Sequence, residues 1–371
     1  MGMEHNDAMP GSSATPAPDR LALIDSARRA VFADAGPGAA VDTWIERSWR
    51  RCLSAGLRPA QRLGFDLIPA QARQRVLDAS QPLVRAARPV LDRLSRTLAS
   101  TRYFAILTDG AGVVIDAHGP IDRSDRRADL ITRVGVDLSE RSVGTTAIGA
   151  ALTELHAVWL HRGEHFFDDT SVYSCAGAPL FGPDGRCIGM LDLTGIDAAE
   201  RPQLKHLAAQ SARSIENSLV AALPQSLLLR LNWPGRSLGG DDDGLVSLDA
   251  DGWVRGSNEA ARQMVPQLAP AGGPTHCSEL FAQPWEPLFD LARRSLPQAP
   301  LEVPLWSGLR LQALAQLPGQ PAAAVAPGMT LRDVEFALIR KAVAEARGNV
   351  QQAAQALGIS RATVYRKLGR K

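Results

Sequence analysis

Three side chains near the middle of the chain have a spacing that could hold a metal ion. His161, Glu164 and His165 spell H-x-x-E-H, which on a helix brings two imidazoles and a carboxylate together for zinc. Gly163 lies inside the motif and strand-forming residues flank it, which disfavours a helix. We therefore expect a turn in which Glu164 and His165 make structural hydrogen bonds, with no bound metal and no cofactor.

Thiols and carboxylates elsewhere could support redox or acid–base chemistry. The four cysteines are scattered without a C-x-x-C pair, which suits a reducing compartment: Cys52, Cys175, Cys187 and Cys277. Cys175 and Cys187 could be redox-active, but the hairpin predicted between them pairs Cys187 with residues near Leu180, and buried free cysteines are usually inert. Asp109 is predicted to be a turn residue and Asp192 a residue at the end of a strand, so we expect no catalytic residue.

The pattern that points most clearly to a function lies at the C-terminal end, where two short helices are predicted. Asn349 can cap the first helix, and its apolar residues recur at i, i+3, i+4 and i+7. Gly358 suits the left-handed residue that ends this helix. Ser360 can cap a second helix, on which Val364 and Leu368 face inward. Such a pair of helices is typical of modules that place the second helix in the major groove of DNA.

The outward face of the second predicted helix supplies the expected DNA contacts. Base reading is assigned to Arg361, Thr363 and Arg366, and phosphate binding to Ser360, Tyr365 and Lys367. Between Leu331 and Lys371 there are nine Lys/Arg and three Asp/Glu, a balance of +6, whereas the whole chain of 371 residues is +2. The remainder therefore sums to −4. Basic charge is concentrated in one small module, as binding to double-stranded DNA requires.

This segment resembles the Fis-type helix-turn-helix, the terminal DNA-binding module of many bacterial enhancer-binding regulators. The matching positions are Gly348-Asn349, Ala353-Ala354, Leu357 to Arg361, Thr363-Val364 and Arg366 to Leu368. In Fis-type modules a lead helix, which would occupy 331–347 here, contributes to dimerisation. The resemblance thus implies an all-α domain over 329–371 that binds DNA as a homodimer.

The segments that precede this module predict a mixed α+β protein. Residues 1–20 are rich in Pro, Ser and Ala and lack the apolar stretch of a signal peptide, so we expect a disordered lead-in. A helical pattern fills 21–100, and a strand pattern follows it, with hairpin turns at Asp109–Gly112 and Gly182–Gly185. A closing helix is predicted over 203–223. No apolar run reaches the ~18 residues that a membrane-spanning helix needs.

This order of elements, with its residues, resembles a GAF sensor domain and more narrowly the sensor half of the acetoin-catabolism regulators. The matching segments include Ser48 to Cys52, Ser142 to Gly149, Gly163 to Phe166, Ser174 to Pro179 and Gly189 to Gly195. The resemblance implies a sensor domain over 101–223 that holds a small ligand between its sheet and a covering loop. By position, the residues expected to line that pocket are Phe104, Ile106, Ser142, Thr145, Trp159, His161, Tyr173, Cys175 and Met190, with His161 and Tyr173 as its polar groups.

Two linkers and a second small domain complete the expected organisation. Pro, Gly and Asp mark a linker over 224–244, and Ala and Pro mark another over 318–328. Between them, 245–317 opens with a strand, an Asp-Gly turn, a strand and an Asn-capped helix, which resembles the beginning of a PAS-like α+β domain.

A feature usual in the regulators that this chain resembles is missing. They carry an ATPase domain with a phosphate-binding G-x-x-x-x-G-K-[ST] loop, whereas no lysine follows a glycine anywhere in this sequence. Only about 105 residues separate Leu223 from Thr330, fewer than the roughly 230 of such a domain. We therefore expect no ATP hydrolysis.

Taken together, these features predict a cytoplasmic, ligand-responsive transcriptional regulator that is not an enzyme. Its expected partners are double-stranded DNA, a small-molecule effector, a second copy of the chain, and RNA polymerase or a full-length enhancer-binding relative; no membrane is involved. Two alternatives stay open. The chain could be an antagonist or repressor of full-length sigma-54 activators, or its GAF-type fold could be a redox or metal-dependent enzyme.

Overall fold

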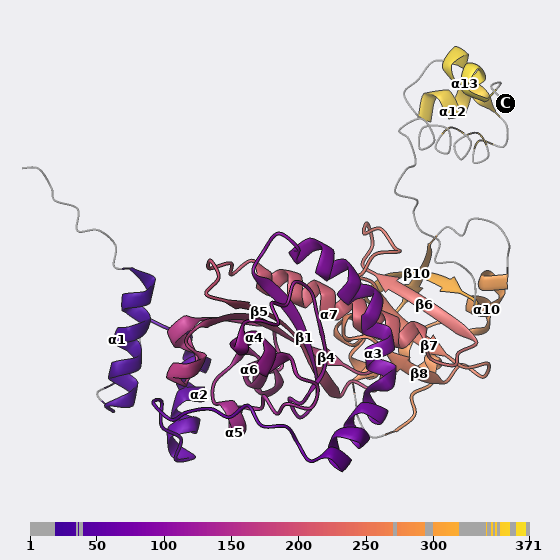
Figure 1. Ribbon diagram of the computed structural model, residues 1–371. Helices are drawn as coiled ribbons and strands as arrows, with labels where there is room; N and C mark the ends of the chain where they lie inside the picture. Colours follow the sequence, from indigo (N-terminus) through magenta and orange to yellow (C-terminus); the bar gives the residue numbers. More distant parts are fainter. Residues whose placement is uncertain are drawn as a thin grey trace, which may run out of the picture.

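The computed structural model describes residues 19–318 apart from 35, 37–39, 270–272 and 294–299, together with 339, 343, 346, 349–356 and 361–368. Two five-stranded antiparallel sheets and their helices make up most of this structure (Figure 1), which confirms the α+β class. Nearly all of the predicted disordered lead-in and of the linker predicted over 318–328 falls outside the described residues. Within the described ranges, no helix is both long and apolar enough to span a membrane.

The first sheet has the strand order β2-β1-β5-β4-β3. Its strands are β1 (Tyr103–Asp109), β2 (Val114–His118), β3 (Val158–His161), β4 (Tyr173–Phe181) and β5 (Cys187–Ile196). Both predicted hairpins are present. In the first turn, the Asp109 carboxylate accepts hydrogen bonds from the backbone N–H groups of Ala111 (3.0 Å) and Val113 (2.8 Å), as expected of a turn aspartate.

The helices around this sheet divide between its two faces (Figure 1). They are α1 (Arg20–Phe32), α2 (Thr43–Ser54), α3 (Ala70–Leu98), α4 (Arg126–Thr132), α5 (Glu140–Val143), α6 (Ala147–Glu154) and α7 (Leu204–Ala221). The long helices α3 and α7 bury apolar stripes at helical spacing on what we call the α3/α7 face. Helices α2, α4, α5 and α6 pack on the opposite side, the α2/α6 face.

The second sheet has the order β8-β7-β6-β10-β9. Its elements are β6 (Leu227–Asn232), β7 (Gly244–Leu248), β8 (Val254–Ser257), α8 (Glu259–Met264), α9 (Cys277–Leu280), α10 (Glu286–Arg293), β9 (Leu301–Pro304) and β10 (Arg310–Gln316). The linker predicted over 224–244 is therefore wrong in part, because β6 lies inside it as the central strand. Leu227, Leu229 and Leu231 alternate into the core of this sheet, and the Pro- and Gly-rich flanks obscured that pattern.

Helix α7 joins the two sheets. Its buried residues complete the core of the α3/α7 face, whereas Val220 near its end packs against Leu228 and Leu245 of the second sheet. The Asn217 side chain accepts a hydrogen bond from Asn258 Nδ2 (2.7 Å) and donates one to the carbonyl oxygen of Asp241 (3.0 Å). One helix thus contributes to the packing of both domains.

The C-terminal segment contains α12 (Val350–Ala356) and α13 (Arg361–Leu368). Asn349 Oδ1 accepts hydrogen bonds from the backbone N–H groups of Gln351 (3.1 Å) and Gln352 (3.2 Å), so the predicted cap is confirmed. Val364 is fully buried against Ala354 and Ile339, as its inward position predicted. The predicted turn residues Gly358 and Ser360 lie outside the described residues.

Candidate functional site

A polar network on the α2/α6 face joins the segment from Ser48 to Cys52 with the segment from Glu140 to Thr145. Ser48 of α2 donates a hydrogen bond to Glu140 (2.7 Å) and lies 2.7 Å from the Thr145 hydroxyl. Arg51 binds both oxygens of Glu140 at 2.8 Å, in the geometry that suits a guanidinium and a carboxylate. Gly144 has φ +65°, which favours glycine, and this lets the chain turn from α5 directly to Thr145. The network fixes α2 against the start of α6.

Five of the predicted pocket residues lie together on the α2/α6 face of the sheet. They are Phe104, Ile106, Tyr173, Cys175 and Met190, and all are buried. The Tyr173 hydroxyl donates to the carbonyl oxygen of Arg127 (3.2 Å), and burial raises the pKa of both Tyr173 and Cys175. The pairing register places Cys175 opposite Thr194 and Cys187 opposite Phe181, so the two cysteines do not face each other, as predicted.

The other predicted pocket residues do not join that group. Ser142 is exposed and donates a hydrogen bond to Asp137 (2.6 Å), while Thr145 is buried in the network with Ser48. Trp159 packs on the α3/α7 face, and His161 stacks on it with ring centroids 6.3 Å apart. Because side chains of a strand alternate between the two faces, the predicted set does not line one pocket.

The H-x-x-E-H segment forms a short 3-10 helix at Arg162–Glu164. Glu164 accepts a hydrogen bond from the backbone N–H of His161 (2.6 Å) and pairs with Arg20 (2.9 Å), while burial raises its pKa to about 7. His165 Nδ1 lies 3.0 Å from the Arg162 carbonyl oxygen, and burial lowers its pKa to about 4. The predicted structural hydrogen bonds of Glu164 and His165 are confirmed.

Sequence reasoning misplaced one carboxylate. Asp192 was expected at the end of a strand, but it lies inside β5, 1% exposed, and the expectation is wrong. The Thr194 hydroxyl donates to its Oδ2, its Oδ1 has no hydrogen-bond partner, and burial raises its pKa to about 7. The signal was present in the sequence, since strict alternation along Met190, Asp192 and Thr194 puts all three side chains on one face.

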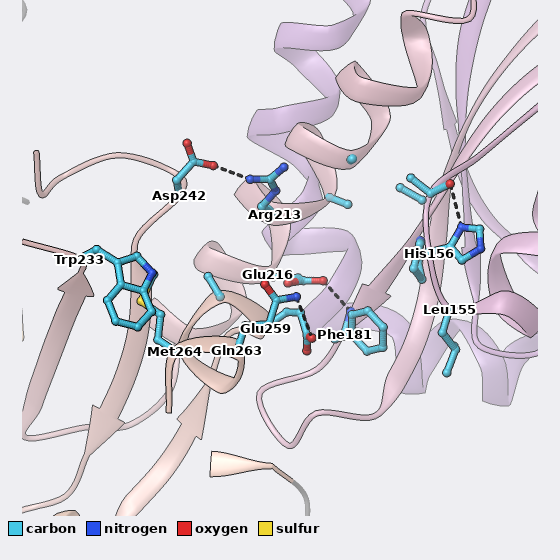
Figure 2. Close-up of a pocket in the computed structure, with 16 residues that line it drawn as sticks. Leu155, His156, Phe181, Arg213, Glu216, Trp233, Asp242, Glu259, Gln263 and Met264 are labelled. Carbon is cyan, nitrogen blue, oxygen red and sulfur yellow. Dashed lines mark hydrogen bonds and ion pairs between the residues drawn. The ribbon is translucent and has the colours of Figure 1, made fainter. Parts of the chain in front are cut away.

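Two of the cavities outside the α2/α6 face border α7 or the predicted residue Trp159. One, of about 460 Å³, opens where α7 passes from the first sheet to α8, and Figure 2 shows Arg213 paired with Asp242 on its wall. Glu216 at this cavity accepts a hydrogen bond from the Phe181 N–H (2.9 Å), and burial raises its pKa to about 7. The other, of about 690 Å³, is lined by Trp159 among other residues, and none of the predicted residues of the α2/α6 face borders either cavity.

The predicted DNA-contacting residues fall on or beside α13. Arg361 is exposed at the first position of this helix and donates a hydrogen bond to Gln351 (3.3 Å), and Tyr365 is 63% exposed. Thr363, Arg366 and Lys367 are in the same helix, but their side chains are outside the described set, as is Ser360 altogether. Arg361 and Tyr365 therefore point away from buried Val364, as the predicted outward face requires.

Comparison with known protein families identifies the family of the first domain and of the C-terminal segment. A family model described as MimR, N-terminal domain, matches residues 27–217, more than half of the chain. The chain belongs to this family. The MimR N-terminal domain, so delimited, covers the C-terminal half of α1, the whole first sheet and most of α7. A second family model, described as Bacterial regulatory protein, Fis family, matches residues 330–370, and the chain thus ends in a Fis-type helix-turn-helix.

Several curated relatives of the chain are transcriptional regulators. The acetoin catabolism regulatory protein of Cupriavidus necator is 31% identical over 67% of this chain and 38% of its own length. The propane 2-monooxygenase operon transcriptional activator MimR of Mycolicibacterium smegmatis is 29% identical over 48% of this chain and 30% of its own length. The chain thus covers between a quarter and two fifths of the length of the curated relatives that it matches. The resemblance to acetoin-catabolism regulators is confirmed.

Among solved structures, the E. coli DhaR(N)–DhaL complex aligns with 74% of this chain and 99% of the matched chain. The sequence identity is 14% and the TM-score 0.45.

Proposed function

We propose that the chain is a bacterial transcriptional regulator that binds double-stranded DNA through residues 329–371 and responds to a small molecule bound by its MimR N-terminal domain. The observation that carries this proposal is the presence of both family matches in one chain, the first over 27–217 and the Fis-type helix-turn-helix over 330–370. Relatives of the chain among characterised proteins are transcriptional regulators. Such a protein acts where the DNA is, in the cytoplasm, as a non-enzymatic homodimer.

In this proposal α13 lies in the major groove. Arg361, Thr363 and Arg366 read base edges, while the remaining assigned residues hold phosphates: Ser360, Tyr365 and Lys367. The exposed position of Arg361 at the start of the helix supports this, because the N-terminal residues of a recognition helix meet the bases.

A gel-shift titration with operator DNA selected from a random library tests the proposal. We expect Arg361→Ala to lose about 1–3 kcal/mol of binding free energy and to relax base preference at one position of each half-site. Arg293→Ala is the matched control, since Arg293 is 66% exposed on α10 of the second domain and should leave binding unchanged. Equal affinity and selectivity of Arg361→Ala and wild type would contradict the assigned role.

The effector is proposed to be a small metabolite. Acetoin is the first candidate to examine, because a relative is named an acetoin catabolism regulatory protein. Addition of the effector should change the affinity or geometry of the DNA complex, since a ligand shifts an equilibrium by its different affinity for the two states. The same gel-shift titration, repeated with and without acetoin, measures this.

An antagonist of full-length activators is the second candidate function. It is favoured by the segment between the two matched regions. The second sheet occupies residues 227–316 there, and the G-K pair of a phosphate-binding ATPase loop is found nowhere in the sequence. A chain of this kind would occupy enhancer sites without hydrolysing ATP, either alone or mixed with a full-length relative or RNA polymerase. Deleting its gene separates the two functions: target transcription rises if the protein represses and falls if it activates.

A further inference from the structure

Asp192 occupies the centre of the α2/α6 face. In the pairing register it lies between Ile106 on β1 and Gly177 on β4. On β5 its neighbours on the same face are Met190 and Thr194. Thr194 in turn lies between Phe104 on β1 and Cys175 on β4. Directly paired residues share a face of the sheet, so Asp192 is surrounded by side chains that are apolar or weakly polar.

The Asp192 carboxyl group is incompletely hydrogen-bonded. It is 1% exposed, its Oδ2 accepts from Thr194, and its Oδ1 has no partner. Leaving a buried polar atom unpaired is costly, and an apolar residue of the same shape would normally be more stable there. Glu164 and Glu216, the other strongly buried acids of this domain, each have an arginine or backbone N–H groups as partners. Asp192 therefore differs from them in having an oxygen available to a further group.

The space beside Asp192 is filled by a movable side chain. Gly177, its neighbour on β4, has no side chain, and a Cβ added there would lie 2.7 Å from Met190 Cε and 2.8 Å from the Ala147 carbonyl oxygen. The methyl end of Met190 thus covers the glycine next to the carboxyl group. Methionine has three rotatable bonds and readily adopts other rotamers, so its displacement would free room for a few heavy atoms.

We infer that Asp192 is the hydrogen-bonding anchor for the effector of this domain, and that the effector is a small uncharged molecule with a hydroxyl or carbonyl oxygen that displaces the Met190 side chain. This inference rests on the proposed sensing function and specifies the class of molecule sensed. It assigns a residue that the pocket predicted from the sequence did not include.

The surroundings of Asp192 select against charged effectors. Only burial and the Thr194 hydroxyl shift the pKa of Asp192, so among the described residues no lysine or arginine lies close enough to the carboxyl group to compensate a bound anion. Burial raises the pKa of Asp192 to about 7, and a protonated carboxyl group can both donate to and accept from an uncharged oxygen group. A cation would have to give up its hydration to enter a largely apolar site.

Calorimetric titration of the full chain with acetoin, a hydroxyketone, tests the inference. We expect Asp192→Leu, which keeps the branching of the side chain and removes its oxygens, to weaken acetoin binding about tenfold or more. Asp192→Asn retains a donor and an acceptor and should bind within a few-fold of wild type. Without ligand, the thermal midpoint of Asp192→Leu should equal or exceed that of wild type, because the variant lacks the unpaired carboxyl group.

Butyrate and butylamine serve as charged probes, and Asp290→Leu, at a 63% exposed position on α10, is the matched control that should bind acetoin normally. Unchanged acetoin affinity in Asp192→Leu would overturn the inference. If the thermal midpoint also fell, Asp192 would have a structural role instead. Tighter binding of either charged probe than of acetoin overturns the proposed class. If wild type binds none of the three, the inference fails, and the DNA titration reports separately on the regulator itself.

Discussion

The two faces of the first sheet differ in the buried side chains that they present to the helices. Beneath α3 and α7, the sheet presents side chains such as Leu191 and Leu193 that are fully buried and purely apolar. Beneath α2 and α6, buried apolar residues are interspersed with Ser48, Thr145 and Asp192. Apolar packing gives stability directly, whereas buried polar groups need partners. The α3/α7 face buries polar side chains too, such as Glu216 of α7, which accepts a hydrogen bond from the Phe181 N–H. Our proposal that the effector binds on the α2/α6 face rests on Asp192, whose Oδ1 has no partner.

The largest effect that tests this comparison is expected on the α3/α7 face. Leu193→Ala should lower the free energy of unfolding by about 2–5 kcal/mol, because it leaves a cavity in a fully packed layer. Urea unfolding measures the change. Leu155→Ala is the control, since Leu155 is 51% exposed and its truncation should change stability by no more than about 0.5 kcal/mol. A similar small loss in both variants would break the comparison.

A smaller loss is expected when the polar network of the α2/α6 face is interrupted. Ser48→Ala should lower the free energy of unfolding by about 1–3 kcal/mol, because it removes a buried hydrogen bond to Glu140 and leaves Thr145 without that partner. Ser95→Ala on α3 is the matched control, since the Ser95 hydroxyl bonds only to Leu91 of its own helix. Equal effects in urea unfolding would show that the two faces use serine in the same way.

The last prediction concerns the pH dependence of stability. Folded Asp192 keeps its proton up to about pH 7, whereas the unfolded chain releases it near the ordinary value of 3.8, so the folded state binds more protons between those values. Its contribution is present at low pH and is lost as pH rises through this window, by up to about 1.4 kcal/mol per pH unit. Glu164 and Glu216 act in the same direction, and Cys175 is the titratable group that faces Asp192 from β4.

Urea unfolding of wild type and Asp192→Asn at a series of pH values isolates this contribution. The difference between the two unfolding free energies should change steadily between pH 4 and 7 and level off above it. A constant difference across the series would mean that Asp192 is ionised in the folded protein and that its burial is offset by another group.

The order of elements was predictable from the sequence because turn chemistry and periodicity are local. Hairpins marked by Asp109 and by the Gly182–Gly185 turn formed where expected, and the Asn349 cap did too. The strand β6 was missed because Pro and Gly on either side resemble a linker, and its pairing partner β10 lies some 80 residues further along. A short stretch of sequence around β6 does not reveal pairing with a strand that lies so far along the chain.

The pocket was harder to predict than the fold. Assigning residues by their position in the chain mixed Trp159 and His161 with Cys175 and Met190, although alternation along β3, β4 and β5 sends the two pairs to opposite faces. Which face a strand residue occupies depends on register, and register is set by the partner strands. Alternation along Met190, Asp192 and Thr194 indicates which face Asp192 occupies, but its burial follows from the two strands that flank β5.

The central position of β6 also affects how the second domain folds during synthesis on the ribosome. β6 is the first strand of its sheet to be synthesised, yet one of its two edges is paired by β10, the last. Until the nascent chain has been extended beyond Gln316, the half-built sheet of β6, β7 and β8 carries an open edge that could join another strand. Completion of the second domain is therefore deferred to a late moment of translation, after the whole first domain has emerged.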